Sequence, residues 1–113
     1  MKEIKAIVQP FQLSSVVAAL EDIPDLPGIT VFDVRGFGRR TGRARQDDIE
    51  DGGPLYAMKV QLELVVPDRL ADQVVRTIQA SAHTGNPGDG KIFVSSLDDA
   101  MRIRSGERGE QAL

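Results

Sequence analysis

The residues of this chain that could do chemistry concentrate in a glycine-rich run and in a pair of arginines that follows it. The run reads Thr84-Gly-Asn-Pro-Gly-Asp-Gly-Lys91, and Arg102 and Arg104 come shortly after it. Glycines let backbone N–H groups crowd around an anion, because no side chain holds the anion away. Lys91 adds a mobile positive charge, and the arginines add two guanidinium groups on one face if their segment is extended. Together these residues predict a site for a bound polyphosphate such as a nucleotide.

A plainer interpretation of the same run stays open. Glycines at this spacing are common in turns, so the run could simply lead into a strand while the arginines face water. The combination of the run, the lysine and the arginine pair favours the nucleotide site over the turn.

The composition predicts one globular domain over residues 1–113. Of the 113 residues, 41% are hydrophobic and 27% are charged, which suits a single domain with a two-layer core.

The absence of cysteine excludes disulfides, thiolate nucleophiles and cysteine-ligated metal sites, and no other metal site is predicted. A net charge of −3 disfavours nucleic acid as a partner. No segment has the pattern of a leader or a membrane span, so we expect a cytoplasmic protein without direct membrane insertion.

A faint duplication organises the chain. Residues 8–17 and 65–74 match at Val, Pro, Leu and Val with one constant offset, and each match reads as a strand that ends at a proline and passes into a helix. The expected helices carry apolar stripes at helical spacing. The stripes are Leu13, Val16, Val17 and Leu20 in the first helix, and Leu70, Val74, Val75 and Ile78 in the second.

Four strands are predicted from alternation and position. Ile4, Ala6 and Val8 alternate with charged residues, and the apolar residues from Met58 to Val66 alternate with Lys59, Gln61 and Glu63. Residues 28–37 and 91–95 supply the other two strands. The order strand, helix, strand, strand, helix, strand predicts an α+β fold, the ferredoxin-like βαββαβ sandwich with an antiparallel sheet. Ile7, Val65 and Phe93 would lie on the face without helices, which favours oligomerisation through that face.

One long connection, residues 38–56, joins the second and third strands. Four arginines (Arg39, Arg40, Arg43 and Arg45) precede an acidic block (Asp47, Asp48, Glu50 and Asp51). Both a solvated charge run and a surface that recognises a partner fit this pattern. The acidic block disfavours nucleic-acid binding by the arginines, and it lacks the spacing of a calcium loop.

The sequence resembles the PII signal-transduction family, as a divergent member, over nearly its whole length. Four stretches carry the resemblance: residues 9–13 (Gln-Pro-Phe-Gln-Leu), 34–39 (Val-Arg-Gly-Phe-Gly-Arg), 84–93 and 102–107 (Arg-Ile-Arg-Ser-Gly-Glu). The resemblance implies a regulator, not an enzyme, that forms a homotrimer and binds ATP, ADP or AMP as effectors in clefts between subunits. It further implies a target protein, such as a membrane transporter, contacted by the loop over residues 38–56, and a C-terminal segment over residues 102–113 that completes the cleft.

The site residues implied by the resemblance fall into two sets. The phosphates would contact the glycine loop and, from the adjacent subunit, the arginines. The adenosine and the base of the loop would be surrounded by the remaining residues. The whole nucleotide set is Ile7, Gly28, Thr30, Gly36, Phe37, Gly38, Arg39, Val65, Gly88, Asp89, Gly90, Lys91, Arg102 and Arg104.

Three departures from the family pattern bear on regulation: the first two concern the effector, and the third means that uridylylation of the loop is not expected. Typical members have a lysine where this chain has Gln9, a glutamine where it has Arg40, and in many bacteria a modifiable tyrosine near Gly52. The glutamine helps to hold Mg²⁺ with 2-oxoglutarate, whereas arginine offers no acceptor to a metal. The usual Mg²⁺–2-oxoglutarate route is therefore not expected, and the part played by Mg²⁺ stays open.

A small anion such as a carboxylate or bicarbonate could instead bind directly at Gly38, Arg40 and Lys59. Two regulators remain as alternatives: an ordinary 2-oxoglutarate-responsive nitrogen regulator, and a relative linked to bicarbonate or inorganic carbon. Two further classes also stay open. An enzyme would use Lys91 and the arginines to clamp a transferring phosphoryl group, and a scaffold trimer would have clefts that bind nothing.

Overall fold

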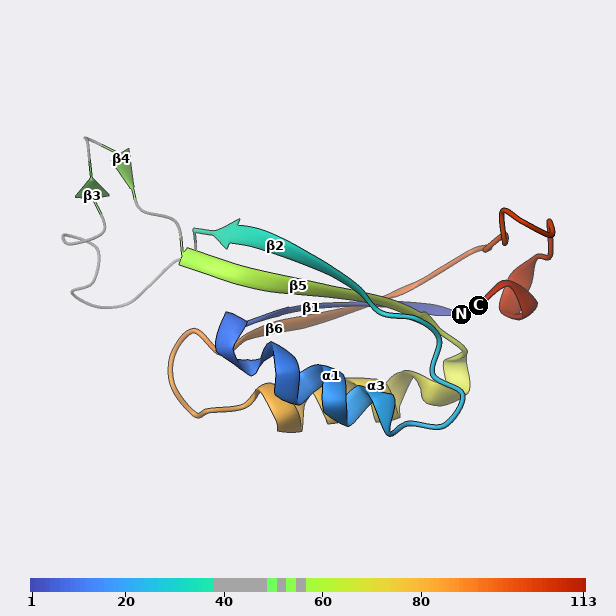
Figure 1. Cartoon of the computed structure of the whole chain (residues 1–113), viewed down its shortest axis with the longest axis horizontal. Coiled ribbons are helices and arrows are strands. Elements are labelled where there is room, and N and C mark those ends of the chain that lie inside the picture. Colours follow the sequence, from blue (N-terminus) through green and yellow to red (C-terminus); the bar gives the residue numbers. More distant parts are fainter. Residues whose placement is uncertain (38–48, 51–52, 55–56) are drawn as a thin grey trace.

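A four-stranded antiparallel sheet with two helices on one face forms the body of the protein (Figure 1). The computed structural model describes residues 1–37, 49–50, 53–54 and 57–113. The strands lie in the order β2-β5-β1-β6, and the order along the chain is strand, helix, strand, strand, helix, strand. The predicted ferredoxin-like sandwich is therefore confirmed. Its elements are β1 (Lys2–Val8), α1 (Leu13–Glu21), β2 (Thr30–Gly36), β5 (Ala57–Val66), α3 (Asp68–Ala82) and β6 (Gly90–Ser96).

Prolines mark both passages from strand to helix, as the duplication predicts. Strand β1 ends at Val8, and Pro10 opens a short 3-10 helix, η1 (Pro10–Gln12), that continues into α1. Strand β5 ends at Val66, and Pro67 immediately precedes α3. A proline donates no N–H to a strand ladder but fits the first turn of a helix, so the chain must leave the sheet there.

The core lies between the helices and the sheet, and it is aliphatic. Alternate residues of β1 and β5 face the helices, and the helices turn the apolar stripes predicted for them toward the sheet. No buried residue in the described part of the chain is polar or charged. The buried hydrophobic residues are Ile4, Ala6, Val8, Val16, Leu20, Ile23, Val60, Leu62, Leu64, Val66, Leu70, Val74, Ile78 and Ala82.

Met58 departs from the expected alternation. Its side chain is 58% exposed, although it occupies the inward register of β5. Strand β1 pairs with β5 only from Val60 to Val66, so the first residues of β5 extend past the end of β1 with only β2 beside them. The apolar pattern continues beyond the part of the sheet that the core covers.

The face of the sheet without helices is mixed in character. The register places Ile7, Val65 and Phe93 on it together, as predicted, and Phe93 is half exposed. Lys5 lies among them, with its Nζ atom 3.6 Å from a Glu3 carboxylate oxygen and 3.8 Å from one of Glu63. An ion-paired centre with apolar flanks therefore characterises this face.

The bounds of the outer strands and the long connection differ from the expectation. Strand β2 is shorter at both ends than residues 28–37, and β6 is one residue longer at each end than residues 91–95. The connection contains a two-stranded sheet, β3 (Ile49–Glu50) paired with β4 (Gly53–Pro54), where no secondary structure was predicted. The sequence between these strands is Asp-Gly, a dipeptide that favours hairpins, and the polarity of the segment concealed this signal.

The C-terminal segment leaves the sheet after β6. A bridge between Met101 and Arg108 closes a turn, and a short 3-10 helix, η2 (Gly109–Ala112), follows. Among the described residues, no helix has the length and apolar character needed to cross a bilayer.

Candidate functional site

The glycine loop joins α3 to β6 and adopts backbone conformations that side chains rarely take. Gly85, Gly88 and Gly90 have φ angles of +89°, +97° and +110°. At Gly90 the constraint is also steric, because a Cβ atom would lie 1.7 Å from the carbonyl oxygen of Ile7 in β1. Glycine is therefore required where the loop enters β6. Residues 84–88 of the loop are exposed.

The Asp89 carboxylate organises the loop from within. It accepts hydrogen bonds from the backbone N–H groups of Thr84 (2.8 Å) and Gly85 (2.9 Å) and from the Thr84 hydroxyl. The same hydroxyl oxygen accepts a bond from the backbone N–H of Asn86 at 3.1 Å. Asp89, predicted as a phosphate-loop residue, thus has its carboxylate directed into the loop.

These hydrogen bonds lower the pKa of Asp89, chiefly through the Thr84 hydroxyl and then through the Thr84 and Gly85 N–H groups. Because the pKa is lower in the folded chain, the loop is stabilised above the pKa of an unfolded aspartate, about 3.9. This stabilisation is lost as the pH falls through the folded-state value. Carbon-detected NMR of the Asp89 carboxyl group should show a lower titration midpoint in the native chain than in a Thr84→Val variant. Equal midpoints would contradict this assignment.

Two side chains from outside the loop hold the Gly88 carbonyl. The side-chain amide of Gln9 donates to its oxygen at 2.8 Å, and the Lys59 ammonium donates at 2.6 Å. Gln9 follows β1, and Lys59 lies on β5, so this one oxygen connects the loop to both central strands. Lys59, predicted as a ligand for a small anion, therefore bonds to the glycine loop.

Several predicted site residues gather at this end of the sheet. Lys91 is exposed and pairs with Ile7 in the register of β6 and β1. Gly36 ends β2 beside Lys59, where an added Cβ would lie 3.6 Å from the Lys59 Cγ atom. We call these residues the loop group: Ile7, Gly36, Phe37, Gly88, Asp89, Gly90 and Lys91.

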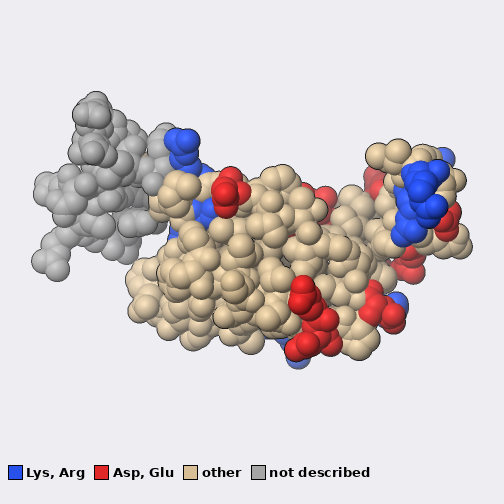
Figure 2. Space-filling model, viewed as in Figure 1, with Lys and Arg blue, Asp and Glu red and all other residues tan. Residues whose placement is uncertain are grey.

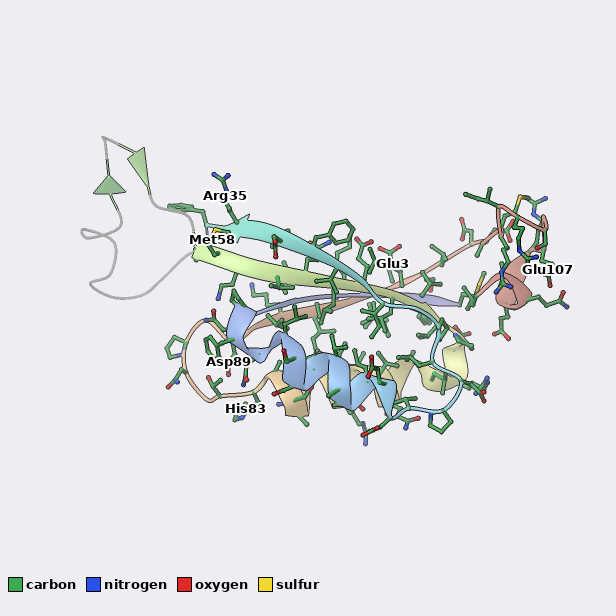
Figure 3. All side chains as sticks on the ribbon, viewed as in Figure 1. Glu3, Arg35, Met58, His83, Asp89 and Glu107 are labelled. Atoms are coloured by element: carbon green, nitrogen blue, oxygen red, sulfur yellow. The ribbon has the colours of Figure 1, made fainter. Side chains whose placement is uncertain are left out.

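The other predicted site residues lie at the opposite end of the same sheet. Thr30 begins β2, and Val65 lies near the far end of β5, opposite Glu3. Figure 3 shows the separation, with Asp89 at one end of the sheet and Glu107 in the C-terminal segment beyond the other. We call these residues the arginine group: Gly28, Thr30, Val65, Arg102 and Arg104.

The distance between the groups follows from the strand that connects them. Gly90 and Ser96 are the ends of β6, so at about 3.3 Å per residue they lie roughly 20 Å apart. Arg102 lies beyond Ser96 along the chain. One chain therefore does not bring the two groups together.

The two arginines lie in a turn, and the extended conformation considered for them is wrong. The backbone N–H of Arg102 donates to the carbonyl oxygen of Glu107 at 2.9 Å, and the N–H of Gly106 donates to the carbonyl oxygen of Arg102 at 2.8 Å. Glycine at position 106, with φ of +75°, permits this reversal. The Arg102 guanidinium donates to the backbone oxygen of Leu113 at 2.9 Å. Figure 2 shows basic side chains gathered on this segment, which also contains Arg108.

Three predicted residues, Gly38, Arg39 and Arg40, lie outside the described residues, as does most of the acidic block. Sequence reasoning also missed two contacts of the loop. It assigned no role to the Thr84 hydroxyl, and it treated Gln9 only as a departure from a lysine. A side chain able to donate or accept hydrogen bonds at the edge of a glycine loop is the signal that could have identified both.

Comparison with known proteins gives the family. The family model described as "Nitrogen regulatory protein P-II" matches residues 1–107. The chain belongs to the P-II family. Proteins named nitrogen regulatory protein P-II from Rhodospirillum rubrum and Haemophilus influenzae are each 44% identical to it over 113 residues, covering all of both chains.

The fold comparison agrees with the sequence comparison. The crystal structure of Arabidopsis thaliana PII bound to citrate matches with a TM-score of 0.78 and 38% identity, over 99% of this chain and 91% of that one. The resemblance stated from the sequence is thus confirmed at the level of the family and its fold.

Proposed function

We propose that this protein is a nitrogen-regulatory signal-transduction protein that binds adenine nucleotides between the subunits of a homotrimer. The observation that carries the proposal is the division of the predicted site into a loop group and an arginine group at opposite ends of one chain. In a ring of identical subunits, a heterologous contact joins two different surfaces of neighbouring copies, so the loop group of one can meet the arginine group of the next. Family membership supports the regulatory role, and the same division argues that nucleotide binding depends on assembly.

The chemistry of the combined cleft suits a polyphosphate. The glycine loop offers backbone close to the ligand, Lys91 is exposed, and the arginines supply planar donors for phosphate oxygens. Three or four charge-assisted hydrogen bonds at about 1.5–3 kcal/mol each could give micromolar affinity, about −8 kcal/mol, after the costs of ordering.

Signalling would proceed by a shift between conformational states of the loop over residues 38–56. The last described residues before this loop, Gly36 and Phe37, belong to the loop group, so a nucleotide in the cleft would contact the base of the loop. ATP, ADP and AMP would favour different loop states if they bind them with different affinities. A target protein, such as a transporter or an enzyme, would read the loop state, and this chain would have no catalytic task itself.

A small anion is proposed as a second effector at Lys59, with Gly38 and Arg40. The Lys59 ammonium lies at the Gly88 carbonyl, beside the nucleotide loop. The related Arabidopsis protein was crystallised with citrate, a carboxylate. Since Arg40 offers no acceptor to Mg²⁺, a carboxylate or bicarbonate would pair directly with the cations.

A calorimetric titration panel tests this proposal. ATP, ADP and AMP would each be titrated alone, with Mg²⁺ and 2-oxoglutarate, and with bicarbonate. We expect micromolar binding of at least one nucleotide and no tight binding of 2-oxoglutarate with Mg²⁺ and ATP. Tight 2-oxoglutarate binding would instead make this an ordinary 2-oxoglutarate-responsive regulator. The absence of binding by every nucleotide would support the scaffold alternative, and sustained hydrolysis of ATP would support the enzyme.

A further inference from the structure

Two side chains from different strands converge on a single backbone oxygen of the glycine loop. The Gln9 amide nitrogen lies 2.8 Å from the Gly88 oxygen, and the Lys59 ammonium lies 2.6 Å from it. A carbonyl oxygen has two lone pairs, so these two donors satisfy it fully. The arrangement fixes the direction in which this carbonyl points.

The direction of the Gly88 carbonyl also sets the direction of the next N–H group. A peptide unit is planar and trans, so the N–H of Asp89 points away from the side on which Gln9 and Lys59 lie. Rotation of this unit by half a turn would exchange the two directions. The loop would then present a carbonyl oxygen where it now presents a donor, and a phosphate would be repelled there.

The backbone offers little resistance to such a rotation, which changes the ψ angle of Gly88 and the φ angle of Asp89. Gly88 has no Cβ atom to restrict ψ, and aspartate takes a positive φ more readily than most residues. The Asp89 carboxylate fixes the other side of the loop through Thr84 and Gly85. The peptide unit between Gly88 and Asp89 therefore depends on the two donors to its carbonyl, Gln9 and Lys59.

We propose that Gln9 is a positioning residue for the nucleotide phosphates, because it holds the Gly88–Asp89 peptide unit in the orientation that binds them. This inference rests on the proposed nucleotide-binding function. Gln9 and Lys59 differ in one respect that matters. The Lys59 ammonium is charged and the Gln9 amide is neutral. An anion that attracts the ammonium therefore leaves the hydrogen bond from Gln9 to the Gly88 carbonyl in place, and the glycine loop keeps its conformation.

The test compares three variants of the full chain by calorimetry with ATP and ADP. Gln9→Leu removes the donor at similar size, Gln9→Lys replaces it with another donor, and Gln79→Leu makes the same change on the exposed face of α3. With one hydrogen bond lost, nucleotide affinity should fall about fivefold to tenfold in Gln9→Leu and should be largely retained in Gln9→Lys. Gln79→Leu should match the native chain.

Hydrogen exchange without nucleotide gives an independent measurement. The backbone amides of residues 84–91 should exchange faster in Gln9→Leu, while the unfolding temperature stays close to that of Gln79→Leu, because the bond is at the surface. Equal nucleotide affinity in Gln9→Leu and Gln79→Leu would overturn the positioning role alone. Failure of the native chain to bind ATP or ADP would overturn the proposed function as well.

Discussion

Gly90→Ala is expected to destabilise the fold by about 3 kcal/mol or more, because it combines backbone strain with a clash against backbone. The added Cβ would lie 1.7 Å from the Ile7 carbonyl oxygen, at a φ of +110°. Relief would require β6 to move away from β1, next to which it packs over its whole length. Chemical denaturation followed by circular dichroism measures the loss.

Gly106→Ala is the matched control for this prediction. Gly106 also has a positive φ, +75°, but an added Cβ there would meet nothing within 4 Å. The backbone strain alone should cost about 1–2 kcal/mol. If the two variants unfold at the same denaturant concentration, the steric argument for Gly90 fails.

Lys91→Ala is expected to weaken ATP binding roughly tenfold to a hundredfold, since a charge-assisted hydrogen bond contributes about 1.5–3 kcal/mol. The Lys91 side chain is exposed at the start of β6, so its removal should leave the stability of the fold nearly unchanged. Calorimetry and thermal unfolding separate the two effects.

Arg76→Ala removes the same charge from the exposed surface of α3, where Arg76 pairs with Asp72 at 2.9 Å. Its ATP affinity should stay within about twofold of the native value, because exposed ion pairs contribute little and long-range charge effects are screened. Equal weakening in both variants would mean that Lys91 acts only through net charge.

The sequence predicted the body of the fold well, because local and tertiary preferences agree there. The alternation of Ile4, Ala6 and Val8, the two prolines and the stripes of both helices all match the structure. Met58 was misjudged because alternation along a strand does not reveal where the neighbouring strand ends. The apolar alternation of β5 continues past the end of β1.

The candidate site was less predictable for a different reason. The arginines at positions 102 and 104 suit an extended segment by spacing alone, but hydrogen bonds to Glu107 and Gly106 close a turn. The roles of Gln9, Thr84 and Asp89 depend on loop conformations that only the positive φ angles of Gly85 and Gly88 make accessible. Gln9 and Gly88 lie far apart in sequence, and the contacts within the loop and within the C-terminal turn follow no periodic pattern.

Subunit mixing tests the central claim most directly. Lys91→Ala and Arg104→Ala, which each impair one group of the proposed cleft, would be unfolded together in equal amounts and refolded, and ATP binding would be measured before and after. If each cleft combines the loop group of one subunit with the arginine group of the next, about a quarter of the clefts in the mixture regain both residues. Tight binding should then appear in that fraction of sites. If the mixture binds no more tightly than the separate variants, the nucleotide is not bound between subunits, and the account is contradicted.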